Sequence, residues 1–465
     1  MIFRFTCVVL SLYLLFFCIE FTSAGIVPQK LSVLDAVEIA RVNSITLKQN
    51  QYAKLDAVSN YRKVSMLTSY NVTAESSLSR QPSSGSAAGI FGTTATYLNP
   101  FGSSVQLTMN PLAVGTSRGA FGVTVNHPLM RGGGIYADRY NQLQNAKSSL
   151  VVQEKSLQNA EKSTIVNVVS AYYQAVLARA QVEIQRNAVK SAQDSAEFLR
   201  RKVDAGFEAG IGLTQADVAV MQAKESLNDA ISVANSATDA LMLAMGVGVG
   251  QSPELIDDVP NYDPPLPSLD EAISKALTNR IEVLQLKENI GQQKRALAIA
   301  EDQMRMGISF TASWNSSILN PGFIGSSILD LGSSFVGMKV AVPVDKRSLA
   351  EDRAISARSL NLMEKQRSFQ DQQLANNVRN AYHAVEKARA SVANLSENEK
   401  IVNLQQYQAR RRLEEGLGTS FDLVKAQNDQ ASFNVQLKSA KVNLYLAHLQ
   451  LQLSTGDDVE IVGAK

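Results

Sequence analysis

The chain has 465 residues, of which 45% are hydrophobic and 19% are charged, and 45 Lys and Arg against 43 Asp and Glu give a net charge of +2. This composition excludes a disordered or collagen-like chain. A near-neutral balance also gives no electrostatic reason to expect nucleic acid as a partner. Length alone suggests about three domains, but an internal repeat described below replaces that estimate.

Residues 1–24 are predicted to be a secretory signal peptide. Arg4 precedes an apolar run over residues 8–17, and the small residues Thr22-Ser23-Ala24 follow as a cleavage site. The run is shorter than the roughly 20 apolar residues of a transmembrane helix, which disfavours a membrane anchor; a lipid on Cys18 stays open. Cleavage after Ala24 removes both cysteines, so no disulfide or cysteine-based metal site is expected. No later stretch reaches 18 consecutive apolar residues.

The remaining chain consists of one structural unit that occurs twice. Ser32-Val-Leu-Asp-Ala36 recurs as Ser268-Leu-Asp-Glu-Ala272, and Gly122-Val-Thr-Val125 recurs as Gly337-Met-Lys-Val340. Such self-similarity in one constant order indicates a duplicated architecture. The predicted domains are the first repeat over residues 25–246, a Pro-rich linker over 247–267, the second repeat over 268–456 and a C-terminal tail over 457–465.

Each repeat predicts the same order of elements: helix, strands, long helix, tip and helix. Helical spacing, period-2 stretches rich in Gly, Ser, Thr and Val, and long runs without Gly or Pro carry this prediction. In the first repeat we expect a helix over 34–67, strands over 70–134, a long helix over 135–205 and a helix over 213–245. In the second we expect a helix over 269–305, strands over 308–344, a long helix over 344–415 and a helix over 420–454.

The long helices determine the predicted helical architecture. The 71 residues from 135 to 205 contain neither Gly nor Pro, and a helix of that length would be about 105 Å long. It cannot bury its apolar stripe in a compact domain and needs partners along its whole length. The two shorter helices of each repeat supply them if they stack end to end. We therefore expect a bundle of long antiparallel helix pairs.

The strands predict an assembly of several chains. Each repeat supplies about two strands, so the chain has about four, too few to close a barrel, and open edges are not tolerated in lipid. Two chains would give eight strands with a filled interior, whereas three would give twelve and room for a channel. A small soluble sheet that caps the helices is the alternative. The aromatic residues near the strands suit interfacial girdles: Tyr97, Phe101, Phe121, Phe310, Trp314 and Phe335.

Across essentially the whole mature chain, this arrangement resembles the TolC family of outer-membrane efflux proteins. The two-copy order of elements carries the resemblance. So do Leu269-Asp-Glu-Ala-Ile273 with Asn279-Arg280 at the start of a half, Gly337 to Pro343 leading into the long helix, and Asp217-Val218 and Asp422-Leu423 after the tips. By resemblance, Pro128 and Pro343 mark the strand-to-helix junctions.

The resemblance implies a fold class and a function. The fold is mainly α with a small β part: duplicated long α-helical hairpins form a tunnel, and about four transmembrane strands per chain form a twelve-stranded barrel in a homotrimer. Such proteins are passive exit ducts in the bacterial outer membrane with a periplasmic tunnel. They join an inner-membrane pump through a periplasmic adaptor, act in efflux or type I secretion, and need no cofactor. The resemblance does not identify the cargo.

The helical tips are the expected adaptor-docking surfaces. Glycine permits the left-handed backbone of a helix reversal and close approach by a partner, although these glycines could merely terminate helices. By resemblance the docking residues are Gly206, Gly212, Leu213, Thr214, Gly416, Leu417, Thr419 and Ser420.

The expected entrance constriction involves Asp217, Asp422 and Lys425. Asp217 and Asp422 lie in the first turn after each tip, where the helix dipole alone also favours a carboxylate. By resemblance, Asp422 of three chains would form an acidic ring. Lys425 stands where the family's best-known member has a second acid, so pairing of Asp422 with Lys425 is an alternative to an acidic ring.

Enzyme and metal functions are not expected. His127, His383 and His448 have no partners at the spacing of a metal site or catalytic triad, and the chain lacks a phosphate-binding glycine loop. The competing class is a secreted coiled-coil scaffold or adhesin stalk without a channel. A stalk does not explain why both strand-rich insertions begin and end at matching points.

Overall fold

The computed structural model describes residues 28–67, 71–80, 87–114, 119–205, 210–318, 334–415, 417, 420–459 and 461. The predicted signal peptide lies outside these residues. The chain divides into two compact units: a helical unit of residues 1–50, 158–280 and 373–465, and a sheet unit of residues 51–157 and 281–372.

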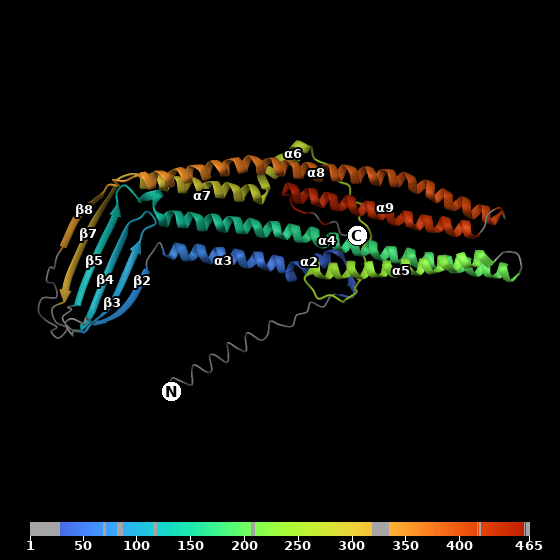
Figure 1. Ribbon diagram of the computed structural model, residues 1–465, viewed down its shortest axis with the longest axis horizontal. Coiled ribbons are helices and arrows are strands. Elements are labelled where there is room, and N and C mark those ends of the chain that lie inside the picture. The colour runs from blue at the N-terminus through green and yellow to red at the C-terminus, as the bar shows by residue number, and fades with distance from the viewer. Residues whose placement is uncertain are drawn as a thin grey trace, which may run out of the picture. The chain divides into compact units, whose positions relative to one another are not determined.

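The duplication inferred from the sequence is visible in the helix lengths. Helices of 11, 23, 67 and 36 residues in the first repeat are matched by helices of 11, 23, 68 and 36 residues in the second (Figure 1). The first set is α2 (Val33–Asn43), α3 (Ile45–Leu67), α4 (Asp138–Asp204) and α5 (Gly210–Met245). The second set is α6 (Leu269–Asn279), α7 (Ile281–Gln303), α8 (Arg347–Glu414) and α9 (Ser420–Thr455).

The repeated serine motifs begin the first helix of each repeat. Ser32 and Asp35 form a capping box at the start of α2, and Ser268 and Glu271 form the same box at the start of α6. In each box the serine side chain accepts a backbone N–H that the helix leaves unpaired, while the acid pairs with the backbone of the serine.

Each N-terminal helix is interrupted once, where the sequence predicted continuous helices over 34–67 and 269–305. Ser44 separates α2 from α3, and Arg280 separates α6 from α7, with extended ψ angles of 122° and 139°. The Ser44 amide still donates to Ala40 O at 2.8 Å and Ser44 O still accepts from Lys48 N at 3.1 Å. Helical hydrophobic spacing continues on both sides of the break, so the sequence pattern does not reveal it.

Tyrosines form the centre of the core of the helical unit. Tyr172 and Tyr173 of α4 are fully buried, and Tyr173 packs edge-on against Tyr445 of α9, with ring centroids 5.8 Å apart. The Tyr172 hydroxyl donates to Leu31 O at 2.9 Å. Burial raises the pKa of Tyr172 to about 12. The phenol therefore stays neutral and serves as a buried donor that attaches the N-terminal segment to α4.

The linker between the repeats crosses the helical unit and binds both halves. Its strand β6 (Glu254–Leu255) pairs in parallel with β1 (Lys30–Leu31). Asp257 accepts from Val33 N at 2.5 Å in the first repeat, and Asp258 pairs with Lys438 at 3.0 Å in the second. The linker is thus ordered by acidic side chains at its contacts with helices of both repeats.

The sheet unit contains one antiparallel sheet with six strands in its described part, in the order β2-β3-β4-β5-β7-β8 (Figure 1). Four come from the first repeat and two from the second, where the sequence led us to expect about two from each. The strands are β2 (Asn71–Arg80), β3 (Ala87–Leu98), β4 (Ser104–Val114), β5 (Gly119–Pro128), β7 (Gly307–Ile318) and β8 (Ser334–Ala341).

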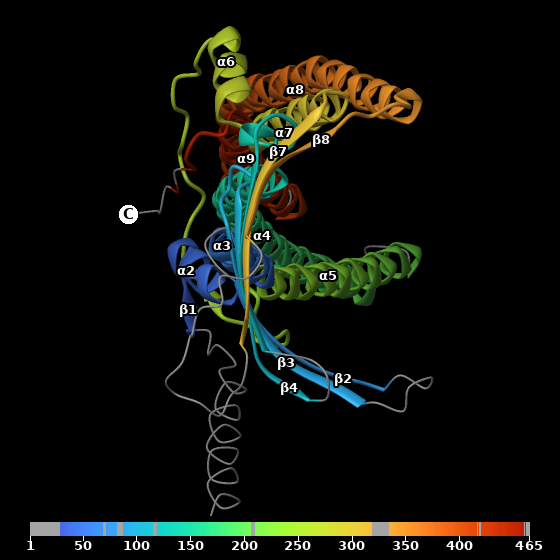
Figure 2. The ribbon, with the colours of Figure 1, turned by 90° about the vertical axis from the view of Figure 1, so that its left-hand side faces the viewer.

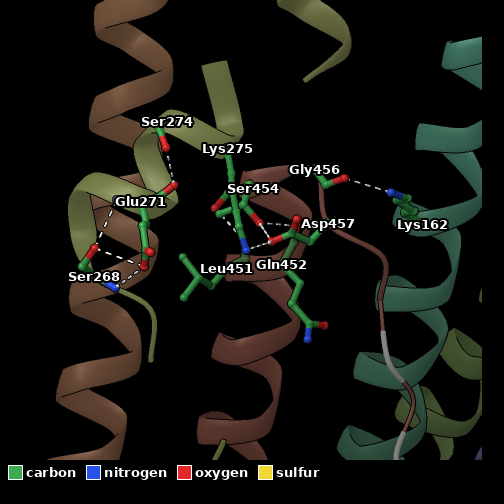
Figure 3. A network of polar contacts seen from close by, with 11 residues as sticks. Lys162, Ser268, Glu271, Ser274, Lys275, Leu451, Gln452, Ser454, Gly456 and Asp457 are labelled. Atoms are coloured by element: carbon green, nitrogen blue, oxygen red, sulfur yellow. Dashed lines mark hydrogen bonds and ion pairs between the residues drawn. The ribbon is translucent and has the colours of Figure 1, made fainter. Parts of the chain in front are cut away.

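The last helix of each repeat ends at a glycine that touches the end of the first helix. Gly246 follows α5 with φ 74°, and a Cβ there would lie 2.6 Å from Asn43 O. Gly456 follows α9 with φ 78°, and a Cβ would lie 3.0 Å from Asn279 Cβ. Figure 3 shows this end of α9, where Lys162 donates to Gly456 O at 2.9 Å and Lys275 lies 3.7 Å from Asp457. Only glycine suits both the backbone angle and the space.

We expect Gly246→Ala to destabilise the protein by about 1–3 kcal/mol, because alanine is strained at positive φ and its methyl group would meet the Asn43 backbone. The free energy of unfolding from denaturant titration measures this cost. Gly248→Ala is the matched control, since a Cβ at Gly248 meets nothing within 4 Å, and it should change stability by less than about 0.5 kcal/mol. Equal effects of the two substitutions would contradict the role of this contact.

Candidate functional site

The two faces of the sheet differ in chemistry. Side chains alternate between the faces along each strand, and the pairing register places residues such as Leu107, Val123 and Trp314 on one face. We call this the apolar face. Its apolar residues are Val72, Ala74, Ala95, Tyr97, Val105, Leu107, Met109, Phe121, Val123, Val125, Ile308, Phe310, Ala312, Trp314, Val336, Met338 and Val340, and Thr93, His127 and Ser334 are polar residues on the same face.

The opposite face, here called the polar face, carries hydroxyl and amide groups. Its residues are Thr73, Thr94, Thr96, Gln106, Thr108, Thr124, Asn126, Ser309, Thr311, Ser313, Asn315 and Lys339. Leu98, Pro128, Phe335 and Ala341 are apolar residues on this face, and the ring of Phe335 lies over Gly337. Among the residues of this six-stranded sheet with described side chains, Lys339 is the single Lys, Arg, Asp or Glu.

The apolar face is too exposed to be a protein core. Val336 and Met338 are 70% and 65% exposed, and Tyr97 and Met109 also retain much of their accessible surface. An apolar surface of this extent, without charges, requires contact with lipid or with another protein surface. Of the aromatic residues expected to form girdles, Tyr97, Phe121, Phe310 and Trp314 lie on this face, whereas Phe335 lies on the polar face and Phe101 lies in a turn.

The strands join the helices through short, closely packed connections. Pro128 is the last residue of β5, and the short helix η1 (Gly134–Tyr136) follows before α4. A Cβ at Gly133 would lie 2.9 Å from Pro128 O, so the chain passes Pro128 closely. Pro343 lies between β8 and α8, in the connection where Asp345 Oδ1 accepts from Arg347 N at 3.0 Å. The buried Asp302 accepts from Gly132 N at 2.7 Å and holds the first connection against α7.

Four helices of the sheet unit lie side by side in the same order as the strands to which they connect. Lys54 of α3 pairs with Glu154 of α4 at 3.0 Å. Ser148 of α4 donates to Glu288 of α7 at 2.5 Å. Glu301 of α7 pairs with Arg353 of α8 at 3.1 Å. The sequence of neighbours is therefore α3-α4-α7-α8, and α3 and α8 are the outer helices on the flanks that carry the outer strands β2 and β8.

The outer face of α8 carries an exposed apolar stripe. Ile355, Leu362 and Phe369, here called the α8 flank, recur every seven residues, and each is more than half exposed. At about 100° per residue, Ile355 and Leu362 lie about half a turn from the side chains that contact α7, Arg353 and Glu364. The stripe therefore points away from the helix layer.

The outer face of α3 has the same character. Tyr52, Leu55 and Met66, here called the α3 flank, are each more than half exposed. Leu55 and Met66 lie about half a turn from the buried Ala57. Both ends of one helix layer thus present apolar side chains outward, a pattern that the search for catalytic and docking motifs in the sequence did not identify.

The first tip connects α4 to α5. Gly206 lies outside the described residues, and Gly212, Leu213, Thr214 and Asp217 lie within the first turns of α5, which begins at Gly210, before the predicted start at residue 213. Arg200 Nη2 lies 3.9 Å from Asp217 Oδ1, so the basic run before the tip faces the acid after it. Ile211 is 73% exposed.

The second tip connects α8 to α9. Gly416 and Thr419 lie outside the described residues, whereas Leu417, whose amide donates to Arg412 O at 2.8 Å, is 78% exposed. Ser420 is the first residue of α9 and Asp422 lies in its first turn. Asp422 and Lys425 are both exposed. The second tip therefore combines an exposed apolar side chain with an acid at a helix N-terminus, where the helix dipole favours it. The expectation that Asp217 also lies in a first turn is wrong, because α5 begins at Gly210 and has no acidic residue in its first turn.

The three histidines lie apart and make separate contacts. The ring of His127 lies 2.6 Å from Ser103 Oγ, and that of His383 lies 3.0 Å from Glu386. His448 is buried and its Nε2 lies 3.5 Å from Asp263 Oδ1. Burial lowers the pKa of His448, with Asp263 acting in the opposite direction. This linker contact, like the others made by the linker acids, was not anticipated from the sequence.

No group of three or more His, Cys, Asp and Glu residues within the described part of the chain could hold a metal ion. No helix among the described residues is long and apolar enough to cross a membrane.

Comparison with known proteins adds three findings. Residues 69–247 match the family model described as outer membrane efflux protein. The chain is 23% identical over 342 residues to the outer membrane efflux protein BepC of Brucella suis biovar 1 (strain 1330), which covers 73% of this chain and 72% of BepC.

The third finding concerns solved structures. The fold is similar to the Campylobacter jejuni CmeC outer membrane channel (TM-score 0.67, 15% identity, 92% of this chain and 86% of CmeC). It is equally similar to the open state of the Neisseria gonorrhoeae MtrE outer membrane channel (TM-score 0.67, 14% identity, 92% and 90%). At these identities the likeness shows the fold. The predicted fold class, long duplicated helices with a small sheet, is thereby confirmed.

We expect Val123→Lys to impair membrane assembly and Thr124→Lys to be tolerated, because the two residues are neighbours on opposite faces of β5. A lysine facing lipid costs up to about 2–4 kcal/mol, whereas one on a water-lined face costs little. The measurement is the fraction of folded protein recovered in the outer-membrane fraction. Equal losses for the two variants would contradict the assignment of the faces.

Proposed function

We propose that this chain, a member of the outer membrane efflux protein family and of the TolC type, works as a homotrimer whose tips dock a periplasmic adaptor that connects it to an inner-membrane pump. The protein is an outer-membrane exit duct, and proteins of this family are passive channels rather than enzymes. The chain accordingly performs no chemistry and needs no cofactor. Its task is to lead solutes from the pump to the outside.

The observation that carries this proposal is the sheet with one apolar and one polar face. The apolar face suits contact with lipid, and the polar face suits a water-filled passage. The same strands continue into α4 and α8 through connections of a few residues. A membrane-embedded sheet is thereby attached to helices that extend the passage on one side. A secreted scaffold or stalk does not explain a sheet with one exposed apolar face and one polar face.

The sheet and helix layer of one copy both end in unpaired flanks, and we assign these flanks to copy–copy contacts. Strand β8 and the α8 flank lie on one side, and β2 and the α3 flank lie on the other. The two sides differ, so the contact is heterologous and a closed ring results when the rotation closes. Pairing of β8 with β2 of the next copy would bring the α8 flank against the α3 flank of that copy. The same contact would then pair the backbone groups of the edge strands and bury the apolar side chains of the two flanks.

The tips are the proposed contact with the adaptor. Ile211 and Leu417 are exposed apolar side chains at the tips. Contact with an adaptor would remove them from water, as is expected for the centre of a docking surface. The docking residues are proposed to be those expected from the resemblance: Gly206, Gly212, Leu213, Thr214, Gly416, Leu417, Thr419 and Ser420.

The entrance of the duct is proposed to lie at the same end, at Asp217, Asp422 and Lys425. Arg200 partly compensates Asp217 in the same chain. Asp422 adds negative charge at the entrance, and Lys425 one turn later weakens the field of an acidic ring. This arrangement supports a mild rather than strong preference for cations.

We expect Leu362→Glu to reduce the trimer population at least ten-fold, because burial of a leucine stabilises an interface by about 1.5–3 kcal/mol and each 1.4 kcal/mol corresponds to a factor of ten. Native mass spectrometry of the detergent-extracted protein measures the oligomeric state. Asn361→Glu is the control, because it places the same charge on the neighbouring exposed position outside the α8 flank. A trimer that survives Leu362→Glu unchanged would show that the α8 flank is not the interface.

A further inference from the structure

The two repeats match helix for helix but not strand for strand. In both repeats a strand follows a 23-residue helix, β2 after α3 and β7 after α7, and a second strand leads into a long helix, β5 before α4 and β8 before α8. The sequence match of Gly122–Val125 to Gly337–Val340 supports the correspondence of β5 with β8. The hairpin of β3 and β4 therefore has no counterpart among the described residues of the second repeat.

The extra hairpin is a full part of the sheet. Strand β3 pairs with β2 over ten residue pairs, and β4 pairs with β5 over seven. Its side chains continue both faces: Tyr97 and Leu107 lie on the apolar face, and Thr96 and Gln106 lie on the polar face. Figure 2 shows β3 and β4 as members of the sheet. The hairpin thus has the chemistry of the strands around it.

The turn of the hairpin is fastened to the strand-to-helix junction. The ring of Phe101 stacks on Tyr140 of α4, with centroids 6.0 Å apart, and Phe101 O accepts from Gly134 N at 2.9 Å. Ser103 Oγ lies 2.6 Å from the His127 ring. Gly102 has φ 97°, and a Cβ there would lie 2.7 Å from Gly132 O. These contacts fix the hairpin at the same level as the other strands.

We propose that the β3–β4 hairpin sets the width of the outer-membrane exit and suits the duct to bulky solutes. The inference rests on the proposed trimeric duct. Three copies of six strands contribute eighteen strands, in place of the twelve expected from four strands each. Because the diameter of a closed sheet grows roughly linearly with strand number, the exit is about 1.5 times as wide as a twelve-stranded one.

The lining of this exit is compatible with large cargo of either charge. The described polar-face residues of the hairpin are Thr94, Thr96, Leu98, Ser104, Gln106 and Thr108, which offer mostly hydroxyl and amide groups and no charge. Such groups hydrogen-bond to water and to passing solutes without holding them through ion pairs. The hairpin therefore adds width to the passage without adding an electrostatic filter.

Deletion of Ala87–Val114 tests the proposal. It removes β3 and β4 and leaves ten residues between Arg80 and Gly119 to join β2 to β5, which already run antiparallel to each other. Single-channel conductance in planar bilayers is recorded with polyethylene glycols of increasing size added only on the exit side. We expect the largest polymer that lowers the conductance to shrink to about two-thirds of the diameter that the unaltered protein admits.

A matched deletion separates strand number from loop length. Removal of residues 320–331 shortens the connection between β7 and β8 and leaves all six strands, so the polymer cut-off should stay that of the unaltered protein. An unchanged cut-off in the Ala87–Val114 deletion would overturn the proposal. Absence of any trimer or conductance in the unaltered protein would instead refute the proposed duct, so the two failures are distinguishable.

A second measurement uses the hairpin intact and decides the matter even if the deletion variant does not assemble. Cysteines occur only at positions 7 and 18, so single cysteines can be introduced elsewhere and read individually. Thr96→Cys should react with a water-soluble maleimide as Thr124→Cys does, and Tyr97→Cys should resist it as Val123→Cys does. Equal labelling of positions 96 and 97 would place the hairpin outside the membrane sheet and overturn the proposal.

Discussion

A helix of 67 or 68 residues can bury its apolar side chains only if other helices accompany it along its length, and the rest of the molecule depends on this constraint. The chain meets it by placing shorter helices in series. In each repeat the end of the last helix meets the end of the first at a left-handed glycine, Gly246 against Asn43 and Gly456 against Asn279. The close approach of backbone to backbone at these joints allows two helices to act as one partner for the long helix.

The sheet is governed by a second requirement, that every backbone group in lipid be paired. Within one chain, β2 and β8 remain at the edges, and the helices behind them end in exposed apolar flanks. In the proposed assembly, one additional copy on each side pairs the backbone groups of these edge strands and buries the apolar flanks. Assembly and membrane insertion are thus coupled in the proposed trimer, because neither the sheet nor the helix layer is complete in a single chain.

Much of the fold could be predicted from the sequence because its signals are local and repeated. Long runs without Gly or Pro predicted α4 and α8 to within a few residues, and the recurrence of the serine motifs predicted the duplication. The strand number was harder to predict. Residues 87–92 are mainly Ala and Gly, and β4 contains Pro111, which argues against a strand because proline donates no backbone hydrogen bond. The pairing of β4 with β5 ends at Asn110, immediately before it.

The candidate site was only partly predictable for a different reason. Tip residues such as Leu417 and Asp422 were located from their positions in the repeat, since a helix reversal has local sequence signals. The flanks at Leu362 and Leu55 have the same heptad-like spacing as buried positions, so the sequence alone does not tell an outward stripe from a core stripe. Only the contacts of Arg353, Glu364 and Lys54 with neighbouring helices show which way each helix faces.

The unmatched hairpin has a consequence for symmetry. Because the two repeats contain helices of nearly equal length, the proposed trimer would carry six nearly equivalent helical units, and its helical part would approach six-fold symmetry. The sheet cannot have six-fold symmetry, because each copy contributes four described strands from its first repeat and two from its second. The junction between strands and helices must therefore connect two different symmetries. The tightly packed segment from Pro128 to Tyr136 is longer than the connection between β8 and α8, so the two repeats also join their strands to their long helices differently.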